Sequence, residues 1–169
     1  LKKISITSPD LHKYLVKGDI IFADDGTLKF TVKKVSGRDI HLIAHAKGVL
    51  KSAKGINVPH INIKGDLITK RDKKMISFAK EIGVDFIGIS FVESSLHLKK
   101  IRRLTNSQPK IVAKVENSQG MKNLEAIIQE TDVIMIDRGD LSTETNIESL
   151  AINQKKIINT SLSYAKPVI

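Results

Sequence analysis

Residues 110–128 read KIVAKVENSQGMKNLEAII and contain one complete strand–helix unit. Residues 110–116 form a largely apolar run of strand length, in which alternate side chains face opposite sides. Apolar side chains then follow at helical spacing, at Met121, Leu124 and Ile128. The stretch therefore predicts a buried strand that leads directly into a helix.

The same order of strand and helix occurs before and after this unit. Before it we expect a helix from Thr69, which the capping-box pair Thr69 and Asp72 opens and Gly83 stops. A strand at 84–91 and a helix from about Ser95 follow that helix. After the unit we expect a strand from Val133 and a long helix from about Ile147 to Ala165. Three strand–helix units in succession, with strands apolar enough to be buried on both faces, predict a parallel sheet. No GxGxxG motif opens a helix, so a dinucleotide-binding sheet is unsupported.

Residues 1–63 have the pattern of short antiparallel strands. Apolar and polar side chains alternate along 28–35, and the turns Asp24-Asp25-Gly26 and Ser36-Gly37 separate this run from its neighbours. We therefore expect a small β-rich domain at 1–63 and an α/β domain at 64–169.

Polar residues gather where the predicted parallel strands end, at Ser90, at Lys114 with Glu116, and at 137–140. A (β/α)8 barrel keeps its active site at that edge. Three or four strand–helix units make at most half of such a barrel. The expected fold class is therefore α/β, a partial (β/α)8 barrel with a small antiparallel β lid domain.

Composition narrows the functional classes. The 169 residues are 41% hydrophobic, enough for one ordinary core, and no run of about 18 apolar residues suggests a membrane span. The absence of cysteine excludes disulfides and is typical of a cytoplasmic protein. A net charge of +10 suits an anionic partner, but only 4% of residues are aromatic, which disfavours nucleic acid.

The charged strand ends suggest a site for a metal ion and a phosphoryl group. Alternation places Lys114 and Glu116 on the same side of their strand. Glu116 and Asp140 suit a hard divalent cation such as Mg²⁺, and Lys114 suits a phosphoryl group. Gly139 would let backbone N–H groups approach an anion. Pattern alone leaves open a ligand-free network of ion pairs among the same charges, with Arg138 included.

Several stretches resemble pyruvate kinase in their order along the chain. They are GDIIFADDG (18–26), KSAKGINVPH (51–60), GVDFIGISFVES (83–94), IVAKVEN (111–117), VIMIDRGDL (133–141) and AKPVI (165–169). The pair of motifs IVAKVEN and RGDL, in this order, is specific, whereas either motif alone is weak. The resemblance covers nearly the whole chain.

The resemblance implies transfer of a phosphoryl group from phosphoenolpyruvate to ADP, giving pyruvate and ATP. It implies Mg²⁺ or Mn²⁺ as cofactor, K⁺ bound by ligands outside this chain, and a homo-oligomer, a tetramer, at full length. Carried over by position, Glu116 and Asp140 would hold the metal, and Lys114 would be the catalytic and substrate-binding lysine. The backbone at Gly139 and Asp140 would receive the substrate carboxylate, and Arg138 would brace that loop through an ion pair.

The resemblance also implies binding residues outside the charged cluster. Lys54 would reach the nucleotide phosphates, and Ser90 would line the substrate site. Asp25 is a weaker nucleotide-binding candidate, because a plain turn residue explains it equally well.

Four residues depart from the family pattern. Asp137 stands where the family has a small apolar residue, Ser142 and His60 replace glycines, and Glu93 takes a position that is often basic. Asp137 and Ser142 favour an alternative, a divergent relative without catalytic activity. A Mg²⁺-dependent lyase acting on pyruvate or an enolate is a second alternative, which the lid segment with Lys54 disfavours.

The chain resembles only part of the family's sequence. The family's first barrel strands, its later threonine near the proton-transfer step and its C-terminal regulatory domain have no counterpart here. We expect these 169 residues alone to have no pyruvate kinase activity.

Overall fold

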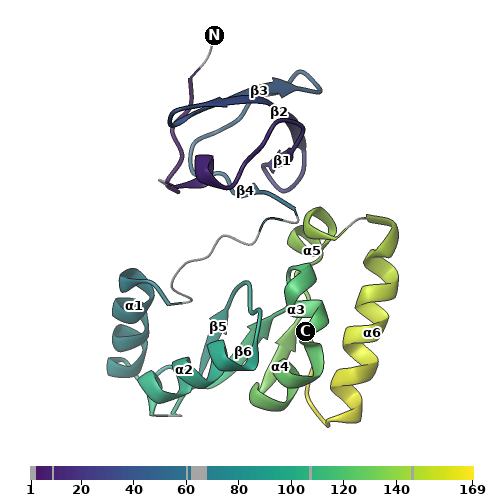
Figure 1. Ribbon diagram of the computed structural model, residues 1–169. Helices are drawn as coiled ribbons and strands as arrows, with labels where there is room; N and C mark the ends of the chain where they lie inside the picture. The colour runs from purple at the N-terminus through teal and green to yellow at the C-terminus, as the bar shows by residue number, and fades with distance from the viewer. Residues whose placement is uncertain (1–2, 9, 60, 62–67, 107, 146) are drawn as a thin grey trace. The chain divides into compact units, whose positions relative to one another are not determined.

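The computed structural model describes residues 3–8, 10–59, 61, 68–106, 108–145 and 147–169. The chain divides into two compact units, Leu1–Lys64 and Gly65–Ile169 (Figure 1). The domain boundary expected at 63/64 falls within 62–67, outside the described residues.

The first unit is built on one antiparallel sheet with the strand order β3-β2-β1-β4. Its elements are a short 3-10 helix at Leu11–Lys13 and the strands β1 (Ile20–Ala23), β2 (Leu28–Ser36), β3 (Asp39–Ala44) and β4 (Ile56–Asn57). Leu11, Leu15, Ile21 and Val32 form its buried core. The four-stranded sheet agrees with the predicted antiparallel pattern, and β4 extends it by pairing with β1.

The turn between β1 and β2 has an unusual backbone. Asp24 and Asp25 both have φ of 54°, and Gly26 follows with φ of 83°. Left-handed conformations at two successive residues suit the twist of a tight hairpin, and aspartate tolerates them better than most side chains do. The Asp24 N–H donates to the carbonyl of Gly55 at 3.1 Å, which fastens the turn to the residues before β4.

The second unit contains a parallel sheet with the strand order β5-β6-β7. Its elements are α1 (Lys70–Glu81), β5 (Phe86–Ile89), α2 (Ser95–Thr105), β6 (Lys110–Lys114), α3 (Ser118–Lys122), α4 (Leu124–Glu130), β7 (Val133–Met135), α5 (Arg138–Glu144), a 3-10 turn (Ile147–Ser149) and α6 (Leu150–Ser163). Three strand–helix units in a parallel sheet are what the sequence predicts for part of a (β/α)8 barrel. Among the described residues, the sheet does not close on itself.

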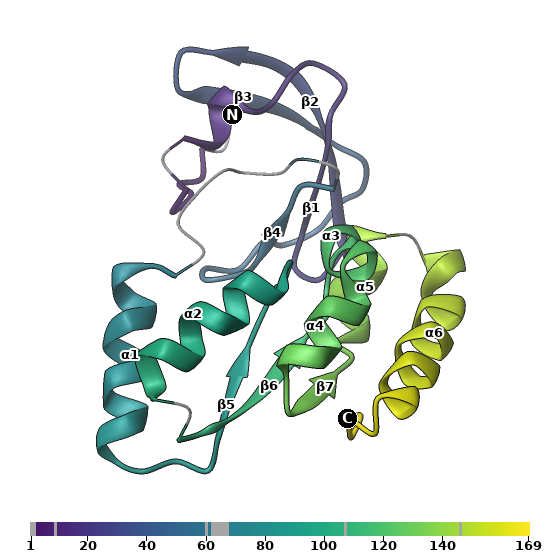
Figure 2. The same ribbon diagram turned by 60° about the horizontal axis from the view of Figure 1, so that its bottom comes forward.

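The helices α1, α2, α4 and α6 lie side by side in that order along the sheet (Figure 2). Alternate residues of β6 face this helical layer. Ile111, Ala113 and Val115 are fully buried in one core with Leu98 of α2 and Ile127 of α4. The opposite side chains of β6 lead to the charged strand end.

The sheet extends one step beyond β7. Val168 forms a parallel bridge with Ile134, and the N–H groups of Ile134 and Ile136 donate to the carbonyls of Pro167 and Ile169. The last residues of the chain therefore continue the parallel sheet beside β7.

Two sequence-based boundaries are wrong. The strand expected from Val133, with 137–140 at its end, is shorter in the structure: β7 ends at Met135, and α5 begins at Arg138 with Asp137 as its N-cap. The single helix expected after β6 is broken at Asn123 into α3 and α4. The capping box at the start of α1 is confirmed, because Thr69 and Asp72 each accept a hydrogen bond from the other's backbone N–H.

The apolar stripe of α1 is exposed in this unit. Met75, Phe78 and Ile82 are 59%, 53% and 57% exposed, whereas Ile76 is buried. The predicted helix is confirmed, but this unit leaves its apolar stripe uncovered. Among the described residues, no helix is both long and apolar enough to cross a membrane.

Candidate active site

Glu116 is the most deeply buried acidic residue of the candidate site. It follows β6, its side chain has no exposed surface, and its Oε2 accepts a hydrogen bond from the backbone N–H of Phe91 at 2.5 Å. Phe91 follows β5 with φ of 51°, a left-handed conformation that is uncommon for a bulky residue. The strained backbone after β5 therefore directs a donor at the buried carboxylate.

Lys114, the last residue of β6, contacts two carboxylates. Its Nζ lies 2.6 Å from Oε1 of Glu116 and 3.0 Å from Oδ2 of Asp137. A longer contact of 3.4 Å joins the same nitrogen to the hydroxyl of Ser90. The structure thus brings together the strand-end residues Lys114, Glu116 and Ser90, as the sequence suggested.

Three carboxylates meet where β6 and β7 end. One oxygen from each of Glu116, Asp137 and Asp140 lies within 4.8 Å of the other two. Asp140 is in the first turn of α5, and Asp137 precedes that helix. Asp137, which the sequence left unexplained, is therefore part of the cluster.

The local charges shift the acid–base behaviour of this cluster. Burial raises the pKa of Glu116, against the opposing effect of the Lys114 ammonium and the Phe91 N–H. The contact with Lys114 lowers the pKa of Asp137. Burial works to lower the pKa of Lys114, but the hydrogen bonds and charges of Glu116 and Asp137 outweigh it and raise that pKa above its usual value. The ammonium and the Asp137 carboxylate are consequently both charged at neutral pH.

The donor set fits a hard divalent cation. Carboxylate oxygens are the ligands that Mg²⁺ and Mn²⁺ prefer, and two or three of them leave positions for water or substrate. Oε1 of Glu116 is buried and, among the described residues, accepts no hydrogen bond of regular geometry beside its ion pair with Lys114. A buried carboxylate oxygen of this kind is suited to a metal ion.

Gly139 and Arg138 lie at the exposed start of α5. A Cβ on Gly139 would lie 3.5 Å from Oδ1 of Asp137, in ordinary contact, so the glycine is not required by crowding. Arg138 is exposed, and none of the ion pairs found among the described residues includes it. The ion pair that we expected to brace this loop is therefore absent from the described residues, and the neighbouring Asp137 pairs with Lys114.

In the first unit, Lys54 has a different partner from the one considered in the sequence. Its Nζ lies 2.6 Å from Oδ1 of Asp24, and Asp25 is exposed at the turn. This contact lowers the pKa of Asp24 and raises that of Lys54. Sequence reasoning missed Asp24, although its place in the turn DDG was the available signal.

The other departures from the family pattern have ordinary structural roles where they are described. The Ser142 hydroxyl donates to the carbonyl of Gly139 at 2.8 Å, within the first turn of α5. Glu93 accepts a hydrogen bond from the side-chain amide of Asn117 at 3.0 Å, and its carbonyl accepts one from Asn123 at 2.6 Å. His60 lies outside the described residues.

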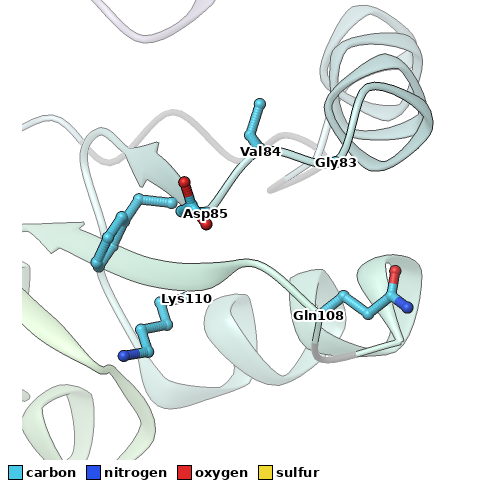
Figure 3. A pocket seen from close by; sticks show the side chains of 6 residues that line it. Gly83, Val84, Asp85, Gln108 and Lys110 are labelled. Atoms are coloured by element: carbon cyan, nitrogen blue, oxygen red, sulfur yellow. The ribbon is translucent and has the colours of Figure 1, made fainter.

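A shallow hollow of about 420 Å³ lies at the other edge of the parallel sheet (Figure 3). It is lined by Gly83, Val84, Asp85, Phe86, Gln108 and Lys110. These residues surround the starts of β5 and β6, whereas the carboxylates follow the ends of β6 and β7. In barrels that starting edge serves stability, so the hollow is not the catalytic cleft.

Comparison with known proteins identifies the family of the chain. The family model for the barrel domain of pyruvate kinase matches residues 1–169. Pyruvate kinases from Thermococcus litoralis and Clostridium perfringens are 38% and 36% identical over 98% and 99% of this chain. The pyruvate kinase of Geobacillus stearothermophilus is 35% identical over 99% of it.

The chain spans only about a third of these relatives, since it covers 36%, 36% and 30% of their respective lengths. The family model and the identities nevertheless extend over both units of the structure. The parallel sheet is accordingly part of a (β/α)8 barrel, and the chain belongs to the pyruvate kinase family.

Proposed function

We propose that this chain supplies part of the active site of an enzyme that transfers a phosphoryl group from phosphoenolpyruvate to ADP. In that reaction the enol oxygen–phosphorus bond breaks, a bond forms from phosphorus to a terminal oxygen of ADP, and the enolate takes up a proton to give pyruvate. The observation that carries the proposal is the buried Glu116 beside Lys114 and Asp140 at a barrel strand end. The membership of the pyruvate kinase family supports it.

Each residue of the cluster has a distinct role in this proposal. Glu116 and Asp140 hold Mg²⁺ or Mn²⁺, which when bound polarises the phosphoryl group and the substrate oxygens. Lys114 donates hydrogen bonds to the transferring phosphoryl and stabilises the charge that develops on it. The backbone N–H groups at Gly139 and Asp140 receive the carboxylate of phosphoenolpyruvate, and Arg138 and Ser90 line the substrate site.

The nucleotide binds through the first unit in this proposal. Lys54, held by Asp24 at 2.6 Å, has its ammonium fixed before a phosphate arrives. A lysine is a compact charge with three donors, which suits the phosphates of ADP. Asp25 is exposed in the same turn and remains the weaker nucleotide-binding candidate.

The remaining properties are predictions from family membership. They are a requirement for K⁺ with ligands outside this chain, assembly as a homo-tetramer at full length, and a cytoplasmic location. The expectation that the 169 residues alone are inactive is also a prediction.

One observation favours a second candidate, a relative that has the fold without the activity. The Asp137 carboxylate lies 3.0 Å from Lys114 and is charged at neutral pH, so it neutralises part of the ammonium that a phosphoryl group would need. An extra negative charge there also opposes an anionic substrate.

Formation of ATP from phosphoenolpyruvate and ADP by the full-length protein, with and without Mg²⁺, separates the two candidates. We expect Mg²⁺-dependent turnover and, for Lys114→Met, a loss of about 10²- to 10³-fold in kcat, the size typical of a removed charge-stabilising donor. The matched control is Lys122→Met, a lysine of α3 with an exposed side chain. An inactive wild type alongside an active Asp137→Ala variant would show that Asp137 has silenced the site.

A further inference from the structure

Lys114 bridges two carboxylates that come from different strand ends. Glu116 has no exposed surface, whereas the Asp137 side chain is 35% exposed and the Lys114 side chain 21%. The ammonium therefore joins a carboxylate inside the site to one at its edge. A second cation in the site would affect the contact of Lys114 with Glu116 differently from its contact with Asp137.

The register of the sheet explains why Asp137 reaches Lys114. In the parallel pairing of β6 with β7, Lys114 lies opposite Met135. Asp137 follows two residues after Met135, and its Oδ2 lies 3.0 Å from the Lys114 ammonium. As the N-cap of α5 it has an extended backbone with φ of −85°, fixed by the start of the helix. The backbone of Asp137 thus belongs to the start of α5, whereas Glu116 follows β6.

A divalent cation bound to Glu116 and Asp140 would compete with Lys114 for Glu116. The cation and the ammonium would both lie beside the same carboxylate, and these two positive charges repel each other. Without a second anion, the lysine would lose its partner and turn toward water. We propose that Asp137 is a positioning residue for Lys114, which keeps the ammonium in the site when Glu116 turns from the lysine to the metal ion. This inference rests on the proposed function for the metal ligands, but it involves no phosphoryl transfer.

The formal charges agree with this role. Three carboxylates and one ammonium sum to −2, which one divalent cation would neutralise with Lys114 still in place. Expulsion of the lysine would instead leave three carboxylates around one ion. An oxygen of Asp137 lies within 4.8 Å of the oxygens of Glu116 and Asp140. The competing outcome is therefore that Asp137 itself binds the ion and Lys114 leaves the site.

The test follows the exposure of Lys114 in the full-length protein. Lys114 is acylated with a dilute, amine-reactive acylating reagent at constant pH, with and without saturating Mn²⁺. The extent of modification of Lys114 is measured by peptide mass spectrometry. The variants are Asp137→Ala, the nearly isosteric Asp137→Asn, and Asp137→Glu, which restores a carboxylate. The matched control is Asp85→Asn, which removes an exposed negative charge at the starting edge of the same sheet.

We expect Mn²⁺ to leave the labelling of Lys114 slow in the wild type, in Asp137→Glu and in Asp85→Asn. In Asp137→Ala and Asp137→Asn we expect Mn²⁺ to raise the rate of Lys114 labelling roughly fivefold, a size expected for the loss of a partly exposed ion pair. An equal Mn²⁺ response in the wild type and Asp137→Ala overturns the proposal.

Mn²⁺ affinity, measured by electron paramagnetic resonance, shows that the ion is bound in each sample. Folded Asp137→Ala and Asp137→Asn variants that no longer bind Mn²⁺ would assign Asp137 to the metal and also overturn the proposal. Failure of the proposed function is a separate result, namely no ATP formation by a wild type that binds Mn²⁺ and protects Lys114.

Discussion

The carboxylate of Glu116 accepts a hydrogen bond from the backbone N–H of Phe91, whose left-handed conformation points that donor into the site. This hydrogen bond joins two strand ends, because Phe91 follows β5 and Glu116 follows β6. Glu116 therefore contributes to the site in two ways: it accepts the hydrogen bond from Phe91, and its negative charge pairs with Lys114.

Replacement of Glu116 tests these contributions one at a time. Glu116→Ala leaves the Phe91 N–H without its acceptor and Lys114 without its buried partner, so we expect a loss of about 1–3 kcal/mol in the free energy of unfolding. Glu116→Gln retains an acceptor and should lose less. Both variants should weaken Mn²⁺ binding by at least about tenfold. Urea unfolding and Mn²⁺ titration measure the two effects, with exposed Glu125→Gln as control. Unchanged Mn²⁺ affinity in Glu116→Gln would remove Glu116 from the metal site.

The capping box of α1 gives a pH-dependent contribution to stability. Hydrogen bonds from Thr69 lower the pKa of Asp72 in the folded protein, so its stabilising effect is present above the unfolded pKa of about 3.9 and is lost as the pH falls through the lower folded pKa. We expect Asp72→Ala to cost about 0.5–2 kcal/mol at neutral pH and less at low pH. Urea unfolding at several pH values checks this. A cost that is independent of pH would mean that the Asp72 charge contributes nothing.

The nucleotide role of Lys54 predicts a selective kinetic effect. We expect Lys54→Met to raise the KM for ADP by about tenfold, corresponding to about 1.4 kcal/mol, with little change in the KM for phosphoenolpyruvate. Lys51→Met removes an exposed lysine three residues away and serves as control. Equal increases in both KM values would indicate a general loss of structure rather than a nucleotide contact.

The core beneath the parallel sheet predicts a large effect from a single side chain. Ile127 is fully buried between α4 and the sheet, so we expect Ile127→Ala to lower the free energy of unfolding by about 2–5 kcal/mol. Ile152→Ala makes the same chemical change at a residue that is 70% exposed, where we expect less than about 0.5 kcal/mol. Urea unfolding of the 169-residue chain compares the two. Similar losses would contradict the packing described here.

The sequence predicted the elements whose signals are local. The alternation in β6 sorted Ile111, Ala113 and Val115 from Lys114, and the capping box marked the start of α1. These signals depend only on residues a few positions apart.

Features that depend on distant residues were not predicted. The sequence showed Asp137 only as a departure from the family pattern, and its contact with Lys114 depends on the pairing of β6 with β7. Lys54 lies beside Asp24 because β4, which follows Lys54, pairs with β1, which precedes Asp24. Met75 and Phe78 show the related limit that an apolar stripe identifies a helix face without identifying what covers it.

The pairing of Val168 with Ile134 has a practical consequence for protein production. Pro167 and Ile169 accept the hydrogen bonds of Ile134 and Ile136, so removal of these last residues would leave the outer edge of β7 ready to pair with another chain. A variant in which 167–169 are deleted should therefore aggregate more readily through that edge.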